Sequence, residues 1–225
     1  MPSNDFKSEA IVLRRTNYGE TDRIVNFLTP SGSKSALAKG ARKEKSKLAG
    51  GIEVFCLSDI TIHERSSDGL GILTSTKPKH FYENIVKDLE TLEFASNILK
   101  SASKLSSAIE SPDLFNLVKE IFEALDTKLL PINFIDIYYI LNYAEISGEG
   151  INLISDSNGA KLDKDSKYFW DSFAKVFAKN DDGNFNASHI KLLRLIIAGN
   201  LKTISRVKDL DKYTSDFVVI ANSFK

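Results

Sequence analysis

The stretch EAIVLRRTNYGETDRIVNFLT, residues 9–29, reads as a strand, a turn and a second strand. Its first part, Glu9–Arg14, is rich in the β-branched and aliphatic residues that favour extended chain, and so is Arg23–Thr29. Tyr18–Asp22 lies between them and supplies glycine and aspartate, which are typical of turns. The stretch therefore predicts that the chain opens as β-structure.

Three further segments extend the β-pattern towards residue 80. Lys34–Lys39 and Leu70–Thr76 are short candidate strands, and Gly50-Gly51 opens a longer one over Ile52–His63. The longer segment alternates with a period of two, which is typical of a half-buried strand, and its inward set is Val54, Cys56, Ser58, Ile60 and Ile62. Five short strands with glycine turns predict a small antiparallel barrel, because closure removes exposed sheet edges.

After about Phe81 the apolar spacing changes to steps of three and four residues, which predicts helices. One apolar face runs from residue 85 to residue 99, and a second helix is expected to start at Ser111-Pro112-Asp113. A third starts at Pro131, is apolar nearly all round and ends at Gly148, so we expect it at the centre of a bundle.

The last third of the chain predicts a small hairpin and more helices. The hairpin covers residues 151–162 with Asn158-Gly159 as its turn, and helices follow near Tyr168–Ala178 and Ser188–Asn200. The fold class is thus α+β, with one domain over residues 1–80 and an α-helical domain over residues 81–225.

The formal net charge is zero, but the two halves differ. Residues 1–80 hold 13 basic and 9 acidic residues, whereas residues 81–225 hold 17 basic and 21 acidic ones. A local positive field matters more to a polyanion than the overall sum does. The start lacks the pattern of a secretory signal, and no apolar run approaches the roughly 18 residues of a membrane helix, so we expect a cytoplasmic protein with no membrane partner.

Residue patterns for catalysis or metal binding are missing from the sequence. The single cysteine, Cys56, excludes an intramolecular disulfide and a cysteine-based zinc cluster. His63, His80 and His189 lack the spacing of metal ligands. No nucleophile–base motif or carboxylate cluster occurs, which disfavours a hydrolase or nuclease. We therefore expect a non-enzymatic protein without a cofactor.

The segment Lys39–Gly51 is the most unevenly charged part of the chain, with five cations against the single acid Glu44. It falls between two strands of the predicted barrel, where loops commonly bind oligonucleotides. Cations there would contact phosphates and give sequence-independent, salt-sensitive affinity. A solvated loop explains the charge equally well. The candidate DNA-binding residues are Arg14, Arg15, Arg23, Lys34, Lys39, Arg42, Lys43, Lys45 and Lys47.

Two of these segments carry a family resemblance. Tyr18-Gly-Glu-Thr-Asp22 between two apolar strands, followed by Lys39-Gly-Ala-Arg42 and then Gly50-Gly51, resembles the opening of the bacterial RecO proteins of recombination and repair. The resemblance is sharp over roughly residues 8–60. It implies an oligonucleotide-binding (OB) barrel over residues 1–80, followed by a helical domain with a small hairpin.

The resemblance also implies a function and partners. It implies binding of single- and double-stranded DNA, annealing of strands, and loading of recombinase onto strands coated by single-strand-binding protein, together with the partner RecR. Action at the bacterial nucleoid would follow. Many RecO proteins hold zinc on four cysteines around the hairpin, but this chain has no cysteine there, so a zinc site is not carried over. Packing of Leu153 or Leu162 against a helix is expected to support the hairpin instead.

The resemblance further implies that the helical domain receives the acidic, apolar tail of the single-strand-binding protein. An apolar groove with a cationic rim is the physical requirement. The densest basic helix face in this half consists of Lys191, Arg194, Lys202, Arg206 and Lys208. An ordinary amphipathic helix would show the same pattern. The alternative for the whole chain is a non-catalytic scaffold whose basic loop binds an acidic protein partner.

Overall fold

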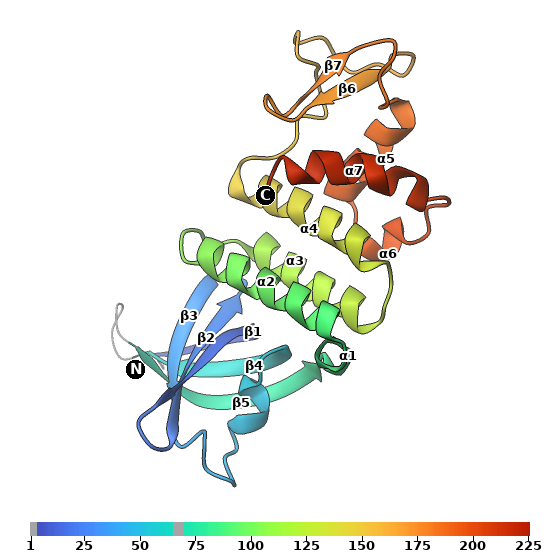
Figure 1. The fold of residues 1–225 in the computed structure, drawn as a ribbon. Helices are drawn as coiled ribbons and strands as arrows, with labels where there is room; N and C mark the ends of the chain where they lie inside the picture. The colour runs from blue at the N-terminus through green and yellow to red at the C-terminus, as the bar shows by residue number, and fades with distance from the viewer. Residues whose placement is uncertain (1–3, 65–69) are drawn as a thin grey trace. The chain divides into compact units, whose positions relative to one another are not determined.

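The structure is a computed structural model that describes residues 4–64 and 70–225. The chain divides into two compact units, Met1–Asp126 and Thr127–Lys225. The first unit holds the strands β1 to β5, a short 3₁₀ helix and the helices α1 to α3, and the second holds the elements from α4 onwards (Figure 1). Strand β5 ends at Phe81, so the compact unit continues well beyond the barrel that the sequence places in residues 1–80.

Five strands of the first unit form a closed barrel in the order β1-β2-β3-β5-β4. The β3–β5 pair is parallel and the other four pairs are antiparallel. This confirms the predicted five-stranded barrel of OB type, and the parallel β3–β5 pair is the one departure from the antiparallel pairing expected. The strands are β1 (Asp5–Tyr18), β2 (Asp22–Thr29), β3 (Gly32–Ala38), β4 (Cys56–His63) and β5 (Gly71–Phe81).

The single strand predicted over residues 52–63 is wrong in its first third. Ala49–Ile52 form a short 3₁₀ helix, η1, and β4 begins only at Cys56. A side chain at Gly51 would collide with Thr76, and the Ser58 hydroxyl donates a hydrogen bond of 3.0 Å to the Gly51 carbonyl. Ile52 is fully buried in the barrel core. It is apolar because it packs in the core from η1, and it does not belong to β4.

Strand β1 is buried on both faces over residues 10–13. Ala10 and Val12 belong to the core cluster inside the barrel. Ile11 and Leu13 are also buried, because they alternate to the opposite face of the strand, where α2 packs. The continuous apolar run at the start of the chain is therefore explained by a strand between the barrel core and a helix.

The helices of the first unit are α1 (Glu83–Lys87), α2 (Leu89–Ser106) and α3 (Pro112–Asp126), and α2 contacts β1, β2 and β3 (Figure 1). The single apolar helix face predicted from residue 85 to residue 99 is wrong at Asp88. There the carboxylate accepts hydrogen bonds from both the backbone and the hydroxyl of Thr91 and caps a new helix. Leu89 lies in the first turn of that helix and is 71% exposed.

The second unit is built around α4 (Ile132–Ser147), which contacts both α5 (Ala187–Ala198) and α7 (Asp211–Asn222). Its predicted central position is confirmed. The helix ends at Gly148, whose φ of 84° lies in the left-handed region that suits glycine after a helix. The remaining elements are α6 (Leu201–Ile204), β6 (Tyr168–Asp171) and β7 (Val176–Lys179).

The helix predicted near Tyr168–Ala178 is wrong, because this segment forms the antiparallel hairpin β6–β7. Tyr168 and Trp170 are buried while Phe169 is half exposed, a period of two that a short window does not distinguish from a helix. Asp171 accepts hydrogen bonds from the backbone of Phe173 and Ala174 and so fixes the turn.

The segment over residues 151–162 turns at Asp156, whose carboxylate accepts hydrogen bonds from the backbone of Asn158 and Ala160. Its strand pairing is one bridge, Ser155 with Lys161. Leu153 and Leu162 are buried, and aromatic rings of the same unit contact one another edge to face, as in the pair Trp170–Phe177. Apolar packing therefore supports this part of the unit.

Within the described ranges, no helix has both the length and the apolar character needed to cross a membrane. Over the same residues, no group of three or more histidine, cysteine, aspartate or glutamate side chains is arranged to hold a metal ion.

Glu9 joins three elements of the first unit. Its carboxylate accepts hydrogen bonds from Lys79 on β5 at 2.7 Å and from Lys119 on α3 at 3.1 Å. These contacts, with Lys79 the stronger, lower the pKa of Glu9. The charged form of Glu9 is therefore favoured by folding.

We predict that Glu9→Gln lowers the free energy of unfolding by about 1 kcal/mol at pH 7, the upper range for partly exposed ion pairs. Because the folded-state pKa is below the unfolded value, the stabilisation is complete above the unfolded pKa and is lost as pH falls through the folded one. Urea unfolding of both proteins between pH 7 and pH 3 should show the difference shrinking with acid. Asp59→Asn, at 3.4 Å from the same lysine but half exposed, should cost less.

Candidate nucleic-acid interface

The turn between β1 and β2 is bound to the segment that follows β3. The Asp22 carboxylate accepts a hydrogen bond of 2.7 Å from the Gly40 backbone, and the Thr21 carbonyl accepts one of 2.8 Å from the Arg42 backbone. The Arg42 guanidinium also donates to the Gly19 carbonyl at 3.3 Å. The two motifs that resemble the RecO opening, Tyr18–Asp22 and Lys39–Arg42, are therefore one structural unit.

The charge of Asp22 is stabilised within this unit. The hydrogen bond from Gly40 lowers its pKa most, followed by the bond from the Thr21 hydroxyl, and the charges of Lys39 and Lys43 lower it further. Gly40 has a φ of 64°, so a left-handed turn brings its N–H to the carboxylate. Asp22 thus holds the basic segment at its start.

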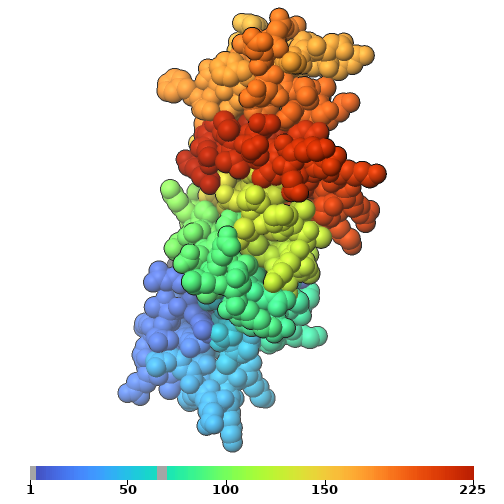
Figure 2. Space-filling model, turned by 45° about the vertical axis from the view of Figure 1, so that its right-hand side comes forward, coloured from blue at the N-terminus to red at the C-terminus, as the bar shows by residue number. Residues whose placement is uncertain are grey.

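The basic segment is anchored in the barrel at both ends. Ala41 is buried in the core cluster, and Leu48 packs against that cluster while its carbonyl accepts a hydrogen bond from the Thr76 hydroxyl. The chain between them makes turns, with a bond from the Lys43 backbone to the Gly40 carbonyl. Figure 1 shows this stretch as a loop that projects from the barrel, and in Figure 2 the light-blue part of the chain, around residue 50, has atoms at the surface.

The five cations of this loop are exposed. Within residues 4–64 and 70–225, no carboxylate forms an ion pair with any of them: Lys39, Arg42, Lys43, Lys45 and Lys47. Two apolar anchors, Ala41 and Leu48, thus hold a short loop whose charged side chains are exposed to water. Such a loop can bind a polyanion without first breaking ion pairs.

The four predicted residues on the strands differ from one another. Arg14 is exposed, whereas Arg15 and Arg23 both contact the carboxylate of Glu53, Arg23 at 3.9 Å. Two arginines around one glutamate leave a net positive charge beside the barrel. These residues lie on adjacent strands, β1 and β2, as the sequence predicts.

Lys34 lies apart from the basic loop. It pairs with Glu64 at 3.2 Å and lies over the ring of Phe6 at 4.9 Å. Lys34 is near the start of β3, opposite Phe27, whereas the loop leaves from the other end of that strand. The structure therefore gathers the loop cations with one another and places Lys34 near the opposite end of β3.

Aromatic side chains contribute little to this surface. Phe27 and Phe55 are buried, and Tyr18 is 55% exposed at the end of β1. Tyr18 is thus the ring that could stack on a base beside the Asp22 turn.

The second predicted site is reorganised by the fold. Arg194 donates two hydrogen bonds to the Leu153 carbonyl, at 2.7 and 3.3 Å, so it supports the segment before the Asp156 turn. Lys191 instead lines a pocket of about 260 Å³ with Lys208. Lys202 and Arg206 are exposed and do not line it, and the rest of its wall is Ser188, Leu192, Leu195, Val207 and Tyr213.

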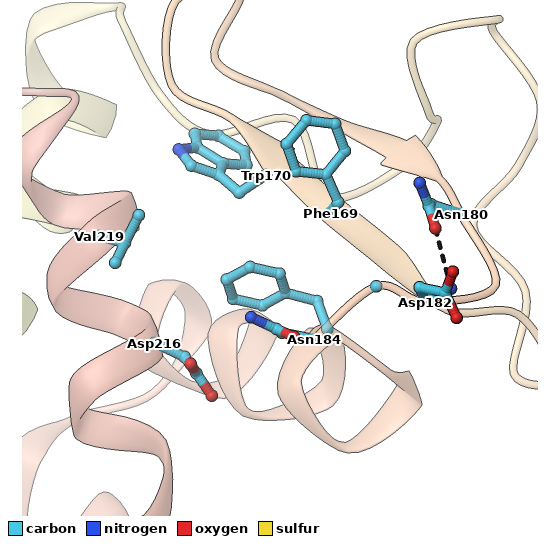
Figure 3. A pocket seen from close by; sticks show the side chains of 9 residues that line it. Phe169, Trp170, Asn180, Asp182, Asn184, Asp216 and Val219 are labelled. Atoms are coloured by element: carbon cyan, nitrogen blue, oxygen red, sulfur yellow. Dashed lines mark hydrogen bonds between the residues drawn. The ribbon is translucent and has the colours of Figure 1, made fainter.

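A different pocket of the second unit has the opposite charge. It measures about 370 Å³ and lies between β6, the loop after β7 and α7 (Figure 3). Phe169 and Trp170 form one side, and Asp182 and Asp216 contribute carboxylates. Acidic groups repel phosphates, so this pocket does not suit a nucleic-acid backbone.

Comparison with known proteins agrees with the resemblance that Tyr18–Asp22 and Lys39–Arg42 show to the RecO proteins. The family model "Recombination protein O N terminal" matches residues 1–82. A DNA repair protein RecO of Alkaliphilus metalliredigens is 27% identical over 211 residues, which cover 90% of this chain and 85% of the relative. One of Dehalococcoides mccartyi is 28% identical over 213 residues, 91% and 83% of the two chains. One of a Roseiflexus species is 39% identical over 87 residues, 39% of this chain and 30% of the relative.

We predict that Asp22→Ala frees the start of the basic loop. Exchange of the Gly40 amide hydrogen should become faster by roughly tenfold, because its acceptor is removed. Hydrogen exchange measured by mass spectrometry or NMR across residues 38–48 tests this. Asp22→Asn keeps an acceptor oxygen and should change exchange less. Equal protection in the alanine variant and the wild type would contradict the role given to this carboxylate.

Proposed function

We propose that this protein acts in DNA repair and recombination, because its N-terminal domain belongs to the RecO family and the similarity covers about nine-tenths of the chain. We propose that it binds single- and double-stranded DNA through the basic loop, Lys39–Lys47, with Arg14, Arg15 and Arg23 beside it. The observation that carries the proposal is a loop of exposed cations without carboxylate partners among the described residues, anchored in an OB-type barrel.

The proposed activity is annealing of complementary strands. Phosphates of two strands repel each other, and cations that contact both strands reduce that repulsion. Such a role needs charge and position, and it needs no catalytic group. It is salt-sensitive, because each phosphate contact releases bound counterions.

The family further suggests loading of recombinase onto strands coated by single-strand-binding protein, with RecR as partner. We propose this role as well, at the nucleoid in the bacterial cytoplasm. The direct test is annealing of complementary oligonucleotides coated with their cognate binding protein. If the protein anneals bare strands but not coated ones, the proposed loading role is wrong.

A pocket of the second unit favours a second binding function. We propose that it holds the acidic, apolar tail of the single-strand-binding protein. Lys191 and Lys208 supply positive charge, and Leu192 and Leu195 supply an apolar wall. This combination suits a peptide that ends in a carboxylate after apolar residues.

The alternative of a protein-interaction scaffold depends on the same loop. An acidic protein partner would be attracted by the same cations that attract phosphates. Strong, salt-dependent binding to plain oligonucleotides distinguishes the two, because a scaffold that recognises a particular protein surface has no reason to bind bare DNA tightly.

We predict that the triple variant Lys43→Gln, Lys45→Gln and Lys47→Gln binds oligonucleotides more weakly. The slope of log affinity against log salt should flatten by about one unit for each lysine that no longer pairs with a phosphate. Fluorescence anisotropy over a salt series measures both quantities. A control variant neutralises three exposed lysines of the second unit: Lys161, Lys164 and Lys167.

Neutralising three charges anywhere changes the net charge equally, so the control separates position from net charge. If the loop variant and the control variant keep the wild-type affinity and slope, the loop is an ordinary solvated segment. If both variants lose the same amount of affinity for DNA, the position of the charges does not matter and the basic loop is not the DNA interface.

For the pocket of the second unit, we predict that Lys191→Gln with Lys208→Gln weakens binding of the tail peptide by roughly tenfold, because two cations next to a carboxylate are removed. Calorimetric titration of the peptide measures this. Lys202→Gln with Arg206→Gln carries the same charge change outside the pocket and should bind normally. Equal affinity for both double variants would exclude the pocket.

A further inference from the structure

A cleft of about 480 Å³ lies between strand β1 and helix α2 of the first unit. Leu13, Arg14 and Val54 line it from the barrel side. Helix α2 contributes residues spaced by three or four positions, which therefore share one face: Ser96, Leu99, Lys100 and Ser103. The volume is within the roughly 300–1,000 Å³ typical of small-ligand pockets.

The shape of β1 exposes the cation of this cleft. The pairing of β1 with β2 shifts register between Val12 and Arg14, so Leu13 is an extra residue at a bulge. Leu13 is buried, whereas the neighbouring Arg14 is exposed. The cleft thus has an apolar floor with a guanidinium at its edge.

No acidic residue lines the cleft, and Glu53, which precedes Val54, is paired with Arg15 and Arg23. No acidic residue occurs from Phe94 to Ile109 on α2 or from Ala10 to Gly19 on β1. Over the described ranges, neither Arg14 nor Lys100 forms an ion pair, and Lys100 donates only a weak bond of 3.3 Å to Asn97 within its own helix. The charge of the cleft is therefore available to an anion.

We infer that this cleft binds one nucleotide unit of a DNA strand, an inference that rests on the proposed function. Arg14 and Lys100 contact the phosphate from the two walls. The sugar and base lie against Leu13, Val54 and Leu99. Lys100 and helix α2 thereby join the DNA interface, which extends from the barrel to the first helical layer.

The neighbouring charges favour a DNA strand as the occupant. Val54 follows Glu53, which is held by Arg15 and Arg23. A strand bound along these arginines would continue into the cleft with its phosphates beside cations. An acidic peptide shares only the charge requirement, and the experiment separates it from DNA.

The first test is the variant Lys100→Gln. Removing one cation–phosphate pair should raise the dissociation constant for oligothymidylate roughly fourfold near 0.15 M salt and flatten the salt slope by about 0.7. Lys77→Gln, on β5 of the same unit, removes the same charge from an exposed position outside the cleft and should have a smaller effect. Circular dichroism confirms that both variants are folded.

The second test uses a thiol. Cys56 is buried, and its burial raises the pKa of its thiol, so it reacts poorly. Ser103→Cys then places a reactive thiol in the cleft, and Ser75→Cys places one on the exposed part of β5. An oligothymidylate with an activated disulfide on its backbone should cross-link to residue 103 and hardly to residue 75. Unmodified oligothymidylate should compete with the cross-link.

The outcomes separate this inference from the proposed function. If the triple loop variant loses affinity while Lys100→Gln equals Lys77→Gln and residue 103 does not cross-link, the cleft is not part of the interface and the proposed function stands. If wild-type protein does not bind oligonucleotides, both fail. If an oligoglutamate peptide prevents the cross-link from forming and unmodified oligothymidylate does not, the occupant is an acidic peptide.

Discussion

The hydrogen bond between the Asp22 carboxylate and the Gly40 backbone determines where the positive charge of this protein lies. It joins the first hairpin of the barrel to the chain that leaves the third strand. Ala41 then enters the core, and Leu48 packs against the core at the other end of the loop. A run of lysines would otherwise repel itself into an extended, disordered segment. Here two apolar anchors and a set of hydrogen bonds to the backbone limit its freedom, so part of the ordering cost of binding is met by folding.

The double burial of β1 has a similar consequence for the helical layer. Because α2 covers the outer face of β1, the strand places Leu13 against the helix and Arg14 at the edge of the contact. Cations from a strand and from a helix, Arg14 and Lys100, thus line one cleft. The ion pairs of Glu9 with Lys79 and Lys119 join the same strand to β5 and α3. The barrel and its helices are therefore one unit in their electrostatics as well as in their packing.

The two units offer surfaces of different charge. The first presents cations on a loop and in a cleft, which suits nucleic acid. The second presents an apolar pocket with two lysines and another pocket with two aspartates, which suit peptides of opposite charge. Under the proposed function, such a separation would keep DNA and an acidic peptide from competing for a single positive surface.

Features that depend on local pattern could be predicted from the residues alone. Alternation and turn residues indicate the barrel strands, the all-round apolar helix indicates its central position, and the density of lysines indicates an exposed loop. Tertiary contacts decided the rest. Glu53 neutralises part of the charge of Arg15 and Arg23, and the Leu153 carbonyl holds Arg194, although each partner is far from it in the sequence. The 3₁₀ turn at Gly51 and the β6–β7 hairpin likewise depend on what each segment packs against. Periodicity describes which face of a segment is apolar, and only the folded chain decides which distant atoms meet that face.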